Sequence, residues 1–456
     1  MTPTARDAKL RQLAAAAQRL ATDATAPLAA LARRLDAEAE VPGQINAVVS
    51  LGSWALATAL EAHLETDSAR TQQLLRLALD AIEAEEMLAK PPRGGGDTHR
   101  TMTSLEAQLR GEGHARGAHI IGVKGRLNIA NADFRGAVFD GVTLTGSVLP
   151  GARFDNCDLR KLKLEGGRIT GARLVSADLR DAVLDGTDMQ GAELFAADFS
   201  GARMQGCKLA SSAWKACRLE DVDLCGSDLR DADLRDAAIV RRLTLTGARL
   251  SGARFSKADL TGVDLRSADL TGTSFVDCKM RKAIFDAARL DEADLSGSDL
   301  RASSFRSAQG KRVRAERALL AEADLMLAQL PGLKAAHLDL RRAKLVRVDL
   351  GEAELEDASF DGATLEWVVL TKANLARARF VDAEMKSCSF AEAKLDSADF
   401  SKSRATECLL ARASVRGAML QTMTDSRSDW SGVDRSAARP TDARRQRAEI
   451  FARSGR

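Results

Sequence analysis

The 456-residue chain contains no tyrosine, and aromatic residues make up only 4% of it. Both values are low for a conventional globular core, and they disfavour a binding groove rich in hot spots, because Tyr and Trp commonly anchor interfaces. The longest apolar stretch, about residues 47–60, is interrupted by Gly52 and Ser53 and is too short to span a bilayer. The N-terminus lacks the apolar run of a secretory signal. These absences predict a cytoplasmic protein, although secretion without a cleavable signal would leave no mark on the sequence.

The chain carries little excess charge of either sign, with 67 Lys and Arg against 64 Asp and Glu. This near-balance gives no strong sign of a nucleic-acid or membrane partner. The cysteines number seven, an odd and scattered set that suits a reducing compartment better than a disulfide framework.

The sequence also lacks the common P-loop, GxSxG and HExxH motifs. Its histidines show no metal-ligand spacing. His114 and His119 lie near a domain junction and could act together, but simple exposure is the plainer interpretation. We therefore expect no enzyme activity, no cofactor and no metal site. The full set of histidines is His63, His99, His114, His119 and His337.

Residues 1–90 are rich in Ala, Leu, Glu, Arg and Gln, which are good helix formers. Leu10, Leu13, Ala17 and Leu20 follow the spacing of one helical face. This composition predicts a small α-helical bundle of about four helices. The sequence PPRGGGD at 91–97 is typical of a flexible joint, and residues 91–125 are expected to form a linker or capping segment.

From about residue 129 a large apolar residue stands at every fifth position, and a small residue stands two places before it. This period is neither the 3.6 of a helix nor the 2.0 of a strand, so it indicates an internal repeat. The frame holds to Ile239, gains one residue at 240–244 and continues to Leu420. At 306–319 the large positions hold Gly310 and Ala315, so the repeat is weak there and we expect a surface loop or bulge.

A chain with this pattern buries its large residues only if it turns the same way after every five. Four turns close a square of about twenty residues, and successive coils then stack as strands about 4.8 Å apart. About 15 coils would form a rod of the order of 70 Å, with ends that need caps. One inner ladder would comprise Phe134, Phe154, Leu174, Leu194, Trp214 and Leu234.

The segments SADLR (176–180), DADLR (231–235), SKADLTGVDLRSADLTG (256–272) and TKANL (371–375) carry a recognisable consensus. It consists of a small residue, Asp or Asn, Leu or Phe, and two polar residues. This pattern resembles the pentapeptide repeat family over residues 126–420. The resemblance implies a mainly β fold, a right-handed quadrilateral β-helix, here preceded by the small helical bundle. Residues 421–456 would form a basic tail, partly disordered or a short helix.

The frame also explains the cysteines, three of which (Cys207, Cys217 and Cys225) lie within twenty residues. Cys207 and Cys217 occupy the small inward position on opposite faces of the square, where they serve as apolar fillers. Four further cysteines, Cys157, Cys278, Cys388 and Cys408, share this position. Only Cys225 is predicted to face outward. The frequent Asp before each large residue is expected to bond backbone N–H groups at the corner rather than to act in acid–base chemistry.

Two basic clusters are candidates for docking an acidic partner. One comprises Lys311, Arg312, Arg314 and Arg317 in the weak repeat, and the other comprises Arg439, Arg444, Arg445 and Arg447 in the tail. The competing interpretation is a solvated loop and an exposed terminus.

Without catalytic motifs, the uniform repeat favours a non-enzymatic scaffold or adaptor for protein partners, and a homodimer is compatible with it. Some members of the family are DNA mimics that bind type II topoisomerases such as DNA gyrase and confer antibiotic resistance. That role needs an acidic surface, yet residues 126–420 hold 45 basic and 44 acidic side chains. A local acidic run offers one candidate face: Glu352, Glu354, Glu356, Asp357 and Asp361. A third hypothesis is an accessory or effector protein of a bacterial secretion system.

Overall fold

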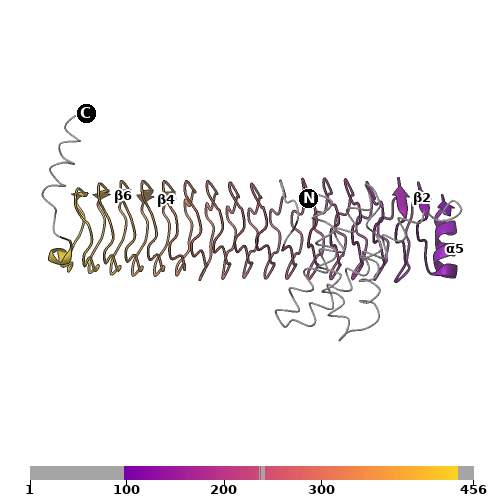
Figure 1. Ribbon diagram of the computed structural model, residues 1–456, viewed down its shortest axis with the longest axis horizontal. Helices are drawn as coiled ribbons and strands as arrows, with labels where there is room; N and C mark the ends of the chain where they lie inside the picture. Colours follow the sequence, from indigo (N-terminus) through magenta and orange to yellow (C-terminus); the bar gives the residue numbers. More distant parts are fainter. Residues whose placement is uncertain (1–96, 236, 238–241, 440–456) are drawn as a thin grey trace, which may run out of the picture.

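The computed structural model describes residues 97–235, 237 and 242–439 (Figure 1). The helical bundle predicted for residues 1–90 and the tail from residue 440 onward lie outside the described residues. Short parallel strands and one helix alternate with turns. The elements are β1 (Thr98–His99), α5 (Met102–Glu112), β2 (His119–Ile121), β3 (Val138–Asp140), β4 (Lys344–Val346), β5 (Thr364–Glu366), β6 (Glu384–Lys386), β7 (Arg404–Thr406), β8 (Thr424–Ser426) and the 3-10 turn η1 (Arg435–Ala437).

The described chain is a mainly β solenoid, a right-handed quadrilateral β-helix of about 16 turns, drawn as a straight rod in Figure 1. Parallel bridges join residues twenty apart, such as Arg153 with Arg173 and Arg173 with Glu193. Each large inward residue donates its N–H to the next coil, as Leu174 does to the carbonyl oxygen of Glu193 (2.8 Å). These coil-to-coil bonds satisfy the backbone along the whole rod.

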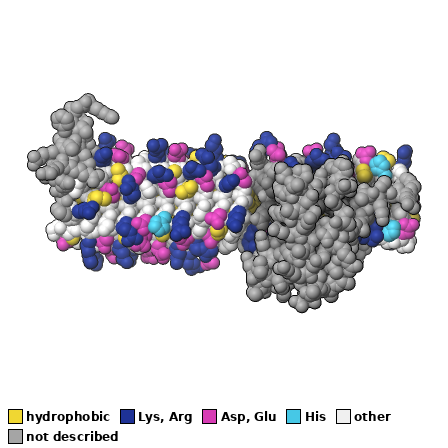
Figure 2. Space-filling model, in the orientation of Figure 1, with side chains coloured by type: hydrophobic (Ala, Val, Ile, Leu, Met, Phe, Trp, Pro, Cys, Tyr) yellow, Lys and Arg dark blue, Asp and Glu magenta, His cyan; other side chains and the backbone are white. Residues whose placement is uncertain are grey.

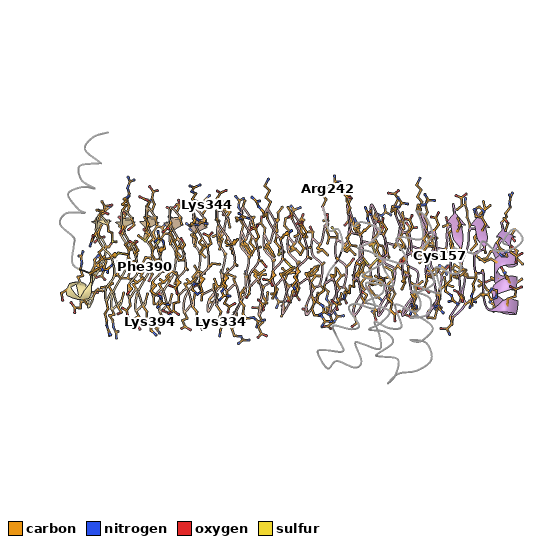
Figure 3. The ribbon with its side chains drawn as sticks, viewed as in Figure 1. Cys157, Arg242, Lys334, Lys344, Phe390 and Lys394 are labelled. Atoms are coloured by element: carbon orange, nitrogen blue, oxygen red, sulfur yellow. The ribbon has the colours of Figure 1, made fainter. Side chains whose placement is uncertain are left out.

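The inside of the rod is a column of side chains drawn from two positions of each five-residue unit. The six residues of the expected inner ladder are fully or almost fully buried, and their outer neighbours bridge one coil to the next from Asp133 to Asp233. The Phe134 and Phe154 rings stack with centroids 5.1 Å apart and planes 7° apart. Figure 3 places Phe390 and Cys157 within the rod.

Most described corners are turns in which the small inward residue donates its N–H to the carbonyl oxygen of the preceding large one, as Ala177 donates to Leu174 (3.1 Å). The residue between them, Ser176, has φ 56°, in the left-handed region. Glycine fits this corner best. The chain nevertheless places many charged residues there, among them Glu322 and Arg342.

We name the four faces by their chain order. Face A carries the ladder that begins at Phe134, and faces B, C and D are those that begin at Phe139, Leu144 and Leu149. Face C includes the five strands β4 to β8, paired in register from Lys344 to Thr424. Lys344 on face C and Lys334 and Lys394 on face A lie along opposite edges of the rod (Figure 3).

Helix α5 closes the N-terminal end of the rod (Figure 1). Leu105 and Leu109 on α5 are buried in the same core as the ladder, and Thr101 caps the helix by accepting from the Ser104 N–H (3.3 Å). The solenoid begins earlier than the predicted residue 126, since His114 already bridges Asp133. The first coil is one residue short, with bridges nineteen apart, so the five-residue frame could not be followed into it.

The one-residue addition predicted at 240–244 is visible in the spacing of the bridges. Ala213 pairs with Asp233 twenty residues later, whereas Asp223 pairs with Thr244 and Asp233 with Arg254, both twenty-one residues later. The core pattern resumes at once, because Leu243 and Leu245 are buried.

The loop or bulge predicted at 306–319 is not formed. Bridges stay twenty apart through Gln309 and Arg314, and Gly310 donates to the Gln329 carbonyl oxygen (2.9 Å). The reason is an exchange of sizes: Val313 and Leu333 fill the position that is small elsewhere, while Ala315 and Ala335 occupy the large one. All four side chains are buried, so this coil keeps an apolar core in which the large and small positions are exchanged.

The predicted end of the repeat at residue 420 is too early. Leu409 bridges Asp429, β8 pairs with β7, and Trp430 packs partly buried against the core, so a further coil precedes η1. Asp425 stands at a large position of this last coil and is exposed, which hides the repeat from the sequence pattern. Within residues 97–439, apart from the gaps at 236 and 238–241, no helix has the length and apolarity to cross a membrane.

Candidate functional site

The cluster of Lys311, Arg312, Arg314 and Arg317 wraps from the corner after face D to the corner after face A. Its charges face carboxylates of the preceding coil: Arg314 pairs with Asp294 at 3.0 Å, and Arg312 pairs with Glu292. Lys311 also donates its backbone N–H to the Asp291 carboxylate (2.9 Å). The cluster is therefore largely balanced by the coil beside it, and only part of its positive charge is free for a partner.

Ion pairing within single units accounts for much of the remaining charge. The chain contains seven Asp-Leu-Arg segments, and in all seven the Arg guanidinium folds back onto the Asp two residues before it, as Arg160 does onto Asp158. Asp158 also accepts the Arg160 backbone N–H (3.2 Å), which confirms the corner role expected for these aspartates. The hydrogen bond from Arg160 lowers the pKa of Asp158. These carboxylates act as turn caps and ion-pair partners.

The acidic run proposed as a DNA-mimic face does not lie on one face. Glu352 stands at the corner after face D, Glu354 on face A, and Asp361 at the corner after face B, because twenty residues complete a full coil. Four of the five acids also have basic neighbours: Glu354 has Lys334 (3.7 Å), Glu356 and Asp357 have Arg377 (2.8 Å each), and Asp361 has Arg379 (2.9 Å). Figure 2 likewise shows acidic and basic side chains interspersed along the rod.

Six cysteines are buried and unpaired, at the small inward position. Each thiol lies against a carbonyl oxygen of the preceding coil, as Cys207 does against Leu184 (3.1 Å) and Cys217 against Leu194 (2.7 Å). Thr187 and Ser227 make the same bond from the same position. Burial raises the pKa of Cys207 to about 12. This donor role, which the sequence pattern does not reveal, explains why small polar residues replace Ala there.

Cys225 is the half-exposed cysteine expected from the frame. Burial, together with a hydrogen bond to the Asp223 carboxylate, raises its pKa to about 11. The thiol is therefore protonated at neutral pH and a poor nucleophile.

The structure does not bring the four described histidines together, and His63 lies outside the described residues. His114 and His119 stand on neighbouring faces, His114 within 4.0 Å of Glu112 and His119 exposed on β2. His337 lies 3.9 Å from Asp357, and His99 bonds Ser104 and Gln108 of α5. Among the residues that the structure describes, no group of three or more His, Cys, Asp or Glu could hold a metal ion.

One feature that sequence reasoning missed is a set of exposed apolar side chains in the C-terminal third of the rod. Trp367 is 54% exposed, Leu327 is 42%, and Val369 and Leu409 are 39%. Leu327 and Trp367 share the corner between faces C and D, and Val369 and Leu409 share face D, so we call these four the apolar edge. Trp367 has φ 57°, a rare backbone conformation for so large a residue. Its exposure could have been predicted only from its place in the five-residue unit.

Comparison with known proteins supports the fold. The family model described as pentapeptide repeats matches eight copies, at residues 127–160, 137–174, 172–209, 215–239, 244–281, 270–306, 336–377 and 349–386. The matches omit residues 307–335, where the large and small positions are exchanged. Comparison with curated protein sequences gives no match.

Several solved structures are similar to this chain. QnrB1, a plasmid-mediated fluoroquinolone resistance protein, is 18% identical, with 46% of this chain and 95% of that chain covered and a TM-score of 0.25. HetL from Nostoc sp. strain PCC 7120, involved in heterocyst differentiation regulation, is 22% identical (67% and 97% covered, TM-score 0.20). Rfr23 from Cyanothece 51142 is 17% identical (33% and 97% covered, TM-score 0.13).

The eight matched copies coincide with the stretches in which a large apolar residue recurs every fifth position and each coil stacks on the next. The chain therefore belongs to the pentapeptide repeat family.

Proposed function

We propose that this chain is a non-enzymatic scaffold that binds a protein partner along its rod. The observation that carries the proposal is the apolar edge of Leu327, Trp367, Val369 and Leu409 on a surface whose other described side chains are mostly polar or small. Trp367 adopts an unfavourable backbone conformation and leaves its apolar ring in water, and neither feature stabilises the fold. A protein partner that covers the ring would remove it from water and so account for its position.

The architecture suits such a role. Coils that repeat every twenty residues hold outward side chains at a rise of about 4.8 Å, on a backbone bonded at every rung. Since the backbone of this surface need not reorder on binding, the part of the entropy cost that comes from ordering loops is small. Faces of this kind fit a partner that presents regularly spaced side chains of its own.

The test is affinity capture from the native host with wild-type protein and with the triple variant Leu327→Ser, Trp367→Ser, Val369→Thr. A partner retained by the wild type and lost by the triple variant supports the proposal. Leu319→Ser is the matched control, because Leu319 is also exposed (36%) but lies on face B, away from the apolar edge. Circular dichroism verifies that each variant is folded. Equal recovery with all three proteins would rule out the apolar edge as the binding surface.

The DNA-mimic role at a type II topoisomerase is the second candidate, favoured by the rod shape alone. The pairing of Asp with Arg within units and of Glu356 and Asp357 with Arg377 between coils leaves no broad acidic face on the described rod. A supercoiling assay with DNA gyrase and excess protein decides it: unchanged supercoiling rejects the hypothesis. The secretion-system hypothesis is tested by the genes that neighbour this one.

A further inference from the structure

Two adjacent columns of side chains beside the apolar edge carry an ordered alternation of charge. On face C the outward positions of successive coils hold Asp324, Lys344, Thr364, Glu384 and Arg404, which bridge one to the next. The corner between faces B and C holds, in the same coils, Glu322, Arg342, Gly362, Asp382 and Lys402. We call these ten residues the charged stripe.

Both columns read acidic, basic, neutral, acidic, basic, and both have their neutral residue in the same coil. If a second copy of the rod is laid against the first in the reverse direction, with these neutral coils aligned, each charge of one copy faces an opposite charge of the other. Lys344 exchanges places with Glu384, and Asp324 with Arg404. At the corner, Arg342 exchanges with Asp382, and Glu322 with Lys402.

Most of these charged side chains have weak or no partners within their own chain, with the exception of Asp324, which pairs with Arg306 at 2.7 Å. Lys344, Asp382 and Lys402 form no ion pair among the described residues, and the bonds of Arg342 to Glu322 (3.9 Å) and Arg404 to Glu384 (3.4 Å) join exposed groups. Exposed pairs of this kind contribute little to stability.

The four charged corner residues also occupy left-handed backbone, with φ between 56° and 63°. Non-glycine residues occupy this corner position all along the described rod, so the conformation keeps the four charged side chains exposed but does not distinguish them from other corners.

We propose that two copies of this chain pair side by side and antiparallel through face C, about a two-fold axis that crosses the coil of Gly362 and Thr364. An isologous interface brings each residue against its symmetry mate's counterpart, so the four charge pairs of the stripe form twice, eight in all. Thr364 meets Thr364 of the second copy on the axis. Glu366, in the same strand β5, also meets its own copy on the axis, and Lys386 at 3.7 Å offsets the charge of each.

The strands β4 to β8 suit this contact, since a face whose strands pair in register can lie against its own copy over several coils. The stripe spans four coil steps, about 19 Å, and is continued at each end by the uncharged pair Ser304 and Thr424. The arrangement keeps face D of both copies on the same side of the dimer. The two apolar edges then adjoin at Trp367 and together form a larger apolar surface for a protein partner. The dimer itself does not depend on that partner.

Sedimentation equilibrium of the full chain tests the proposal. Wild-type protein is expected to dimerise, more tightly at low than at high salt, because the contacts are ionic. The double variant Arg342→Glu, Lys344→Glu sets like charges against Asp382 and Glu384 and should raise the dimer Kd tenfold or more. Adding Asp382→Lys and Glu384→Lys restores opposite signs and should return the Kd to within about threefold of wild type. The control Lys334→Glu, Lys394→Glu, on the opposite face, should leave the Kd unchanged.

Disulfide trapping gives a second readout. In a Cys225→Ser background, Thr364→Cys should form a disulfide-linked dimer on treatment with diamide, because the two thiols meet on the axis. Asn374→Cys, from the same coil on face A, should not. A wild-type chain that stays monomeric, or a dimer that is indifferent to the charge reversal, overturns the proposal. Equal recovery of a partner with the wild type and the apolar-edge variant, together with a dimer that responds to charge reversal, would reject the proposed function alone.

Discussion

Two stretches of the same rod fill their centres in opposite ways. At Phe360, Phe380 and Phe400 successive rings stack with centroids 4.7 Å apart and planes within 4° of parallel. In the coil that contains Gly310 and Ala315 the large positions are small, and an apolar cavity of about 20 Å³ remains, lined by Leu290, Phe305, Val313 and neighbouring leucines. Leu320 and Leu330 keep 5% exposure there, whereas Phe360 and Phe380 keep none.

The backbone hydrogen bonds are nearly the same in the two stretches, despite the difference in side-chain packing. Ala315 donates to the Lys334 carbonyl oxygen at 2.7 Å, and Phe380 donates to that of Asp399 at the same distance. Coil-to-coil hydrogen bonds and corner turns therefore keep the coil geometry, while the side chains inside determine how stable each coil is. Because each coil supports only its neighbours, stability can vary along the rod without a change of fold.

The largest effect is expected from emptying the well-filled stretch. Phe380→Ala removes the middle ring of the stack and should lower the free energy of unfolding by about 3–5 kcal/mol. Urea unfolding followed by circular dichroism measures it. Phe380→Leu is the control and should cost less than about 1.5 kcal/mol. Equal losses for the two variants would contradict this expectation and would show that stacking of the aromatic ring, rather than the volume it fills, carries the contribution.

A smaller loss is expected at Gly310, where the chain is closely packed despite the nearby cavity. A methyl group on Gly310 would stand 2.8 Å from the Leu290 Cβ and 2.9 Å from its carbonyl carbon. Gly310→Ala should therefore cost about 1–3 kcal/mol. Gly351→Ala, at a half-buried surface position with no backbone that close, should cost far less. Similar costs would mean that Leu290 moves aside freely.

Filling the cavity is expected to increase the stability of the protein. Val313→Ile adds one methylene group to the cavity lining and should stabilise the protein by about 0.5–1 kcal/mol. The same change in a filled coil, Val368→Ile, overpacks a fully buried site and should destabilise it. If both variants melt at the wild-type temperature, the two stretches do not differ in packing as described.

The smallest effect concerns the ion pairs that border the weak coil. The hydrogen bond from Arg301 lowers the pKa of Asp299. A lowered folded-state pKa contributes stability above the unfolded value of about 3.9, and that contribution is lost as the pH falls through the folded value. Arg301→Ala should therefore destabilise the protein slightly at pH 7 and should cost almost nothing in acid, below the folded-state pKa of Asp299. Melting curves at the two pH values test this; a cost that persists in acid would assign it to packing.

The five-residue period was sufficient to predict the solenoid, because an apolar residue at every fifth position has no other way to be buried. It also located the extra residue near 240. The weak coil was misjudged because only the large position was followed, and Val313 and Leu333 restore the core from the other one. The ends were misplaced where Asp425 and the short first coil break the period.

The candidate site was harder to predict. The cluster that includes Arg312 and Arg314 looked basic because its neutralising partners, Glu292 and Asp294, lie twenty residues earlier in the chain. The apolar edge likewise joins Leu327 to Trp367 across two coils. Such contacts follow from the stacking of coils rather than from any local pattern.

The twenty-one-residue spacing near residue 240 shows that one extra residue does not disturb the pairing of the coils that follow, which returns to twenty. The length of the rod can therefore change in steps of one coil without a change in the fold of the other coils. Removing one whole coil, such as residues 365–384, would bring the two ends closer by about 4.8 Å while leaving each pointing in its original direction. Duplication or deletion of multiples of twenty codons in the gene would then lengthen or shorten the rod by whole coils.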